Sequence, residues 1–138
     1  MHAPAAILWP VAAHLALIFA LYGWLTLERK AAVRRGDAHM SDYRLYEREP
    51  LRARLIANNL ANQFELPLLF YVLAAILYHS GAVASIQVFL AWVFVAGRIA
   101  HAFVHILSPD VGLRGNVFTV NFLALAAMWG LFLRDALA

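Results

Sequence analysis

The stretch that decides the fold is NNLANQFELP, residues 58–67, at the start of a long apolar run. A helix through it, at about 100° per residue, gathers three polar side chains on one narrow stripe, namely Asn58, Asn62 and Glu65. Gln63 lies on the flank of this stripe. The run that follows, as far as Gly97, contains no Asp, Glu, Lys or Arg. A polar stripe leading into such a run is typical of a membrane helix whose inner face is hydrated or paired.

The composition indicates an integral membrane protein. The 138 residues are 64% hydrophobic and 14% charged, whereas soluble domains average about 25% charged residues. The absence of cysteine excludes disulfides, thiolate metal ligands and a cysteine nucleophile, and we expect no metal site. The net charge of +3 does not indicate a nucleic-acid partner, because eight of the eleven Lys and Arg residues lie at 28–54, beside the apolar runs.

Four apolar segments are long enough to cross a bilayer, for which about 20 residues suffice. Within one domain over 1–138, with a kink at Pro67, the spans are expected at about 5–27, 55–78, 84–107 and 115–133. The positive-inside rule places the polar segment 28–54 in the cytoplasm and both termini on the other side. Residues 43–54 of this polar segment are expected to be helical. The sequence therefore predicts an all-α, integral membrane four-helix bundle.

The buried charges of the second and third spans lie at matching depths. Counted from the span ends at 1.5 Å per residue, Glu65 lies about 16 Å and Arg98 about 15 Å into the membrane. An unpaired charge at this depth costs at least about 2.5–3.5 kcal/mol. We therefore expect an ion pair between Glu65 and Arg98 on these two antiparallel helices.

The same arithmetic pairs Asn62 with His101, and Asn58 with His105, in layers nearer the cytoplasm. In one interpretation these groups are structural, forming interhelical hydrogen bonds and a buried ion pair that fixes the helix register. In the other, they line a polar cleft that opens to the cytoplasm and reaches Arg114 at the start of the fourth span. Such a cleft suits an anionic, water-soluble ligand held by arginine, with a helix N-terminus adding positive potential.

Two motifs resemble those of the MAPEG family, the membrane-associated proteins of eicosanoid and glutathione metabolism. Residues 62–67, NQFELP, are similar to the second-span signature N-x-x-E…P. Residues 97–105, GRIAHAFVH, resemble the third-span pattern G-R-x-x-H-x-x-x-Y of the prostaglandin E synthase branch. Arg114 lies nine residues further, where that branch places the arginine that holds the glutathione thiolate.

The resemblance implies a homotrimer that binds glutathione, as a co-substrate, between subunits near the cytoplasmic face. It implies a glutathione-dependent transferase or peroxidase acting on a lipophilic electrophile from the surrounding membrane lipid, and a bacterial inner membrane is the expected location. Arg114 is then the catalytic residue that stabilises the thiolate, and Glu65 holds the ligand's ammonium group. The residues expected to bind glutathione are Asn62, Glu65, Arg98, His101 and His105.

Three positions depart from the family pattern. Asn58 stands where many members have arginine, His105 replaces the family tyrosine, and Gly115 stands where a serine often follows the thiolate arginine. The candidates to supply the missing positive charge are Arg34, Arg35, Arg52 and Arg54.

These departures leave two other hypotheses open. One is a non-catalytic MAPEG-like membrane module, either an accessory subunit or a lipid-binding protein. The other is proton transport along His101 and His105, which is less favoured because only His79 continues the polar residues towards the far side.

Overall fold

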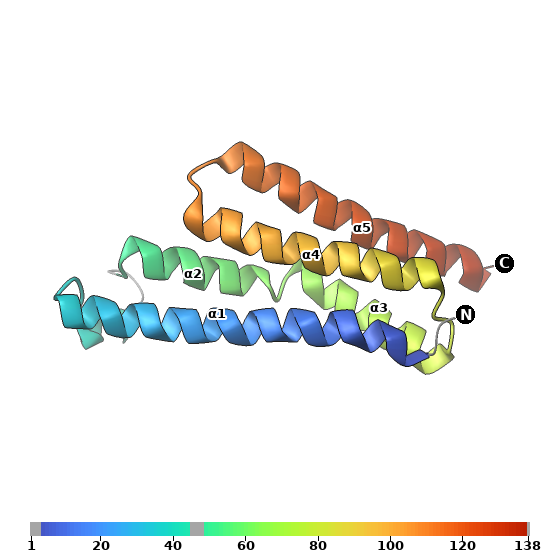
Figure 1. Ribbon diagram of the computed structural model, residues 1–138, viewed down its shortest axis with the longest axis horizontal. Helices are drawn as coiled ribbons and strands as arrows, with labels where there is room; N and C mark the ends of the chain where they lie inside the picture. Colours follow the sequence, from blue (N-terminus) through green and yellow to red (C-terminus); the bar gives the residue numbers. More distant parts are fainter. Residues whose placement is uncertain (1–3, 45–48, 138) are drawn as a thin grey trace.

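A computed structural model of the protein describes residues 4–44 and 49–137. Its elements are η1 (Pro4–Ile7), α1 (Leu8–Arg35), η2 (Met40–Arg44), α2 (Leu51–Asn62), α3 (Leu66–Ser80), α4 (Ser85–Leu107) and α5 (Val111–Leu137), with no strand in these described ranges. In Figure 1, α1, α4 and α5 lie alongside a fourth rod made of α2 and α3, and both chain ends lie at the same end of the bundle. All four rods are long and apolar enough to cross a membrane. The predicted all-α, four-helix membrane fold is therefore confirmed.

Helix α1 continues well into the segment that was predicted to be a polar loop. Residues 28–35, ERKAAVRR, contain good helix formers and neither glycine nor proline. The helix ends at Gly36, whose φ of 78° is a left-handed conformation that glycine adopts without steric cost. Within the expected helix 43–54, the structure places the end of η2 and the start of α2, while residues 45–48 lie outside the described ranges.

The second rod is interrupted between α2 and α3, where the sequence predicted only a kink at Pro67. Proline has no N–H to donate to the carbonyl four residues earlier, that of Gln63, and its ring would collide with that carbonyl. The backbone leaves the helical conformation before the proline, and Glu65 has φ −89° and ψ −97°. The interruption releases the carbonyl of Asn62 from the helical ladder.

Two apolar clusters fill the described part of the bundle, and a polar layer lies between them. One cluster includes Ile18, Leu21, Ile56 and Ile106, and the other includes Phe70, Leu73, Phe94 and Met128. The buried polar side chains His14, Gln63 and Arg98 form the layer, with Tyr71 packed against both clusters. The functional site is built on one side of this layer.

Helices α4 and α5 approach closely at Gly97. A Cβ atom at this position would collide with the side chain of the fully buried Asn121 on α5. The absence of a side chain on Gly97 therefore sets how near α5, which carries Arg114, lies to α4.

Candidate functional site

A pocket of about 560 Å³ opens between α2, α4 and the first turns of α5. Its walls are formed by Asn58, Ala61, Asn62, Glu65, His101, His105, Val111, Arg114, Gly115 and Phe118. All of the residues predicted to form the site line this pocket except Arg98, which lies behind its wall. The structure also places there the three positions that depart from the family pattern.

The two histidines come from one face of α4, because they are four residues apart and a helical turn has 3.6 residues. Their ring centroids are 5.7 Å apart, and the ring of Phe118 on α5 lies 6.1 Å from that of His101. Both histidines are buried, and their Nδ1 atoms have no hydrogen-bond partner among the described residues. The two imidazole rings give this wall of the pocket polar groups that can donate or accept hydrogen bonds.

Arg114 is the pocket's cation on α5, and it lies in the first turns of that helix. Helix α5 begins at Val111, four residues before the start expected for the fourth span. The Oδ1 atom of Asp110 accepts the N–H of Leu113 at 2.9 Å. A carboxylate therefore caps this N-terminus, and the positive potential expected from the helix end near Arg114 and Gly115 is offset by Asp110.

The predicted ion pair between Glu65 and Arg98 is wrong. The Nε and Nη2 atoms of Arg98 donate to Oε1 of Gln63 at 3.1 and 3.0 Å, and Nη2 also donates to the carbonyl of Asn62 at 2.9 Å. Arg98 is 1% exposed, whereas Glu65 is exposed at the pocket wall. The break in the second rod frees the Asn62 carbonyl, which Arg98 uses as an acceptor in place of the Glu65 carboxylate.

Gln63 is the residue that sequence reasoning missed. Pro67 signals a break in the helix near this residue, but no pattern in the sequence identifies the side chain of Gln63 as a partner of Arg98. A helical wheel drawn through an unbroken helix placed Gln63 beside the polar stripe and left it without a partner. In the structure it is fully buried at the centre of the polar layer.

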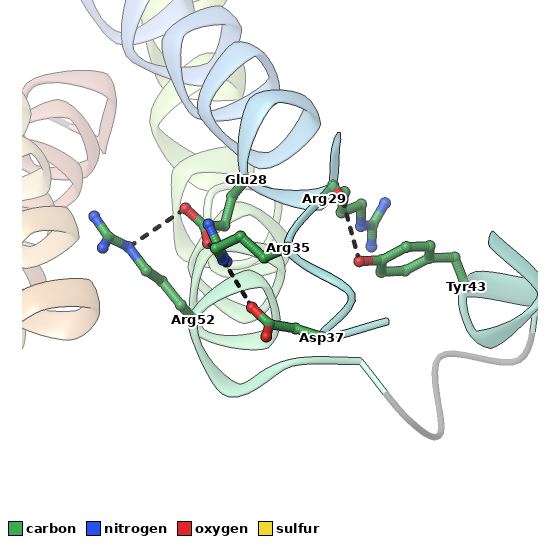
Figure 2. Close-up of polar contacts among 6 residues, drawn as sticks. All are labelled: Glu28, Arg29, Arg35, Asp37, Tyr43 and Arg52. Atoms are coloured by element: carbon green, nitrogen blue, oxygen red, sulfur yellow. Dashed lines mark hydrogen bonds and ion pairs between the residues drawn. The ribbon is translucent and has the colours of Figure 1, made fainter. Parts of the chain in front are cut away.

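Two arginines of the polar segment form ion pairs with acidic neighbours in the same segment, as Figure 2 shows. Arg35 donates to Glu28 at 3.0 Å and to Asp37 at 2.7 Å, and Arg52 on α2 lies 3.5 Å from Glu28. The hydroxyl of Tyr43 donates to the carbonyl of Arg29, and burial raises the pKa of this phenol. None of the four arginines proposed to replace the missing charge lines the pocket in the described chain.

A second pocket, of about 540 Å³, lies between α1 and α2. Arg29, Glu49 and Arg54 line its polar part, and Arg29 donates to Glu49 at 2.7 Å. Asn58 and Ala61 line both pockets. A single helix, α2, therefore separates two cavities at this level.

Comparison with known proteins identifies the family. No curated protein and no solved structure matches the chain. The sequence model of the MAPEG family, in contrast, matches residues 6–134, which include the whole pocket and nearly all of the four rods. This match confirms the resemblance of the two motifs, and the chain belongs to the MAPEG family, the multi-pass membrane proteins of eicosanoid and glutathione metabolism.

Proposed function

We propose that the protein is a glutathione-dependent transferase or peroxidase that acts on a lipophilic electrophile. The observation that carries the proposal is the pocket in which Asn62, Glu65, His101, His105 and Arg114 meet. Its volume of about 560 Å³ lies within the range of about 300–1,000 Å³ that is usual for small-molecule sites. Membership of a family associated with glutathione supports that tripeptide as the polar ligand.

The charges of the pocket suit a thiolate at one place and an ammonium group at another. A free thiol has a pKa near 8.5, so an enzyme of this kind has to favour the thiolate with positive charge. Arg114 supplies that charge, and Glu65 accepts the ligand's ammonium group. Asn62, His101 and His105 position the remaining polar groups. The thiolate sulfur then bonds to the electrophilic carbon, and the leaving group departs with the bonding electron pair.

The second substrate is proposed to come from the lipid. Phe118 and Val111 line the pocket on α5 and are 41% and 65% exposed. They offer an apolar wall next to the polar one. A lipophilic electrophile that diffuses along the bilayer would reach the sulfur from this side.

A homotrimer with the site between subunits belongs to the same proposal. Glu65 and Asn58 are exposed in the single chain, although the predicted depth of Glu65 is about 16 Å. A neighbouring copy over the pocket would remove these polar groups from lipid, where they are costly. Native mass spectrometry or cross-linking in detergent tests this assembly, and a stable monomer would contradict it.

The orientation with the polar segment in the cytoplasm, and a bacterial inner membrane as the host, are also proposals. The orientation rests on the excess of arginine and lysine at 28–54.

Calorimetry with glutathione, and conjugation of a generic aryl halide by the purified protein, test the activity. Arg114→Leu is expected to weaken binding of the thiolate roughly 10- to 150-fold, since a hydrogen bond to a charged group contributes about 1.5–3 kcal/mol. Arg134→Leu is the matched control, because Arg134 lies at the other end of α5 and pairs with the exposed Asp135. A wild-type protein with neither glutathione binding nor conjugation would reject the proposal.

One observation favours the alternative of a non-catalytic membrane module. Among the residues that line the pocket, Arg114 is the only arginine or lysine, and the carboxylate of Glu65 balances it. The tyrosine and serine of the family pattern are also replaced, by His105 and Gly115. Co-purification with a stoichiometric partner protein, without glutathione-dependent turnover, would establish this alternative.

A further inference from the structure

The guanidinium of Arg98 is buried without a carboxylate partner. Its three hydrogen bonds go to uncharged oxygens, Oε1 of Gln63 and the carbonyl of Asn62. None of the ion pairs among the described residues includes Arg98. Hydrogen bonds to neutral oxygens orient the guanidinium without neutralising it, and the carboxylate of Glu65, on the pocket wall, acts on its charge only through space.

Gln63 is fixed in this position from three sides. Its Oε1 atom faces His14 Nε2 at 3.1 Å as well as Arg98, and its Nε2 atom donates to the carbonyl and the Oδ1 atom of Asn59. Because arginine only donates, the atom of Gln63 that faces Arg98 has to be its oxygen. Nε2 of His14 then carries the proton, and Nδ1 accepts the hydroxyl of Tyr71.

We propose that Gln63 is a positioning residue that holds Arg98 as a cation without a directly bonded anion behind the wall of the pocket, where its positive potential favours an anionic ligand. A glutamate has the same shape and would neutralise Arg98 at once. The amide keeps the geometry and leaves the charge to be balanced from the pocket. The identity of the anion as a glutathione thiolate rests on the proposed function, whereas the potential itself does not.

A single hydrogen bond links Arg98 to a residue that lines the pocket. Nη2 of Arg98 donates to the carbonyl of Asn62, whose side chain lines the pocket together with Glu65. His101, one helical turn from Arg98, forms the facing wall, with His105 and Arg114 beyond it. A unit charge about 10 Å from an anion, at an effective dielectric constant of about 20, changes its binding roughly tenfold.

A thiol introduced at Gly115 measures this potential without any ligand. The chain has no cysteine of its own, Gly115 lines the pocket, and a Cβ there would meet no atom within 4 Å. The rate of alkylation of the Gly115→Cys protein is recorded against pH, with and without Gln63→Glu. The new carboxylate is expected to raise the pH of half-maximal alkylation by about one unit, the equivalent of a tenfold change. It is also expected to weaken glutathione binding about tenfold.

Two further variants separate charge from structure. Ser85→Glu adds the same charge at the exposed first residue of α4, at its far end, and should leave the alkylation profile unchanged. Gln63→Met removes the hydrogen bonds without adding charge, so it should lower stability without raising the midpoint.

Each outcome decides the inference. An unchanged midpoint in a folded Gln63→Glu protein would overturn it. A raised midpoint in a protein that never binds glutathione would support the inference and reject the proposed function.

Discussion

Replacement of Gly97 by alanine tests whether the close approach of α4 and α5 sets the geometry of the pocket. The new methyl group would occupy the space held by the Asn121 side chain, which is fully buried. Overpacking of this kind typically costs about 1–3 kcal/mol. The intrinsic helix preference of alanine over glycine opposes this by about 1 kcal/mol, so we expect a net loss of up to about 2 kcal/mol.

A second substitution should rescue the first. Neither amide atom of Asn121 has a hydrogen-bond partner among the described residues, so Asn121→Ala alone removes little hydrogen bonding and should change stability by less than about 1 kcal/mol. In the double variant the methyl group fits. We therefore expect a favourable coupling energy of about 1–3 kcal/mol between the two positions, equal to the overpacking cost that is relieved.

The assay is unfolding in detergent of the wild type, both single variants and the double variant. Glutathione affinity is measured in parallel. The collision at Gly97 should displace α5, which carries Arg114, and should therefore weaken glutathione binding. Gly130→Ala is the control, since a Cβ at that position of α5 meets no atom within 4 Å; this variant should not lose stability. Additive effects of Gly97→Ala and Asn121→Ala would refute the reasoning.

Three other predictions follow from the positions of single residues. Glu65→Gln should keep stability within about 0.5 kcal/mol, because Glu65 is exposed and forms no ion pair with the described residues. The same variant should weaken glutathione binding in calorimetry. A large loss of thermal stability would instead show a structural role. His105→Tyr restores the family phenol at the pocket wall and should raise the conjugation rate severalfold; a lower rate at unchanged stability would contradict this. Asp37→Cys, in a chain without cysteine, should react with an impermeant maleimide only from the cytoplasmic side of membrane vesicles; labelling from the other side would reverse the predicted topology.

The sequence predicted the class of the fold because membrane spans are encoded locally. Four apolar runs of sufficient length, with one charge each in the second and third, have to be helical in lipid, where every backbone group needs a partner within its own segment. Depth in the membrane, counted at about 1.5 Å per residue, also placed Asn62 near His101 and Asn58 near His105. The structure puts all four on the walls of one pocket. That inference depended only on the depth of each residue and on the antiparallel arrangement of the two spans. Neither changes much when a helix is rotated or tilted slightly.

What the sequence did not decide is which oxygen holds Arg98. A helical wheel assumes that the rotation of 100° per residue continues, but Pro67 removes a donor and the chain breaks between α2 and α3. Beyond the break, the direction of Glu65 depends on backbone angles that no periodicity predicts. The partners of Arg98 are therefore chosen by the tertiary structure, through a carbonyl freed at Asn62 and an amide held by His14 and Asn59. Local sequence determined that a buried cation needs acceptors at this depth, and only the packing of three helices determined that these acceptors are neutral.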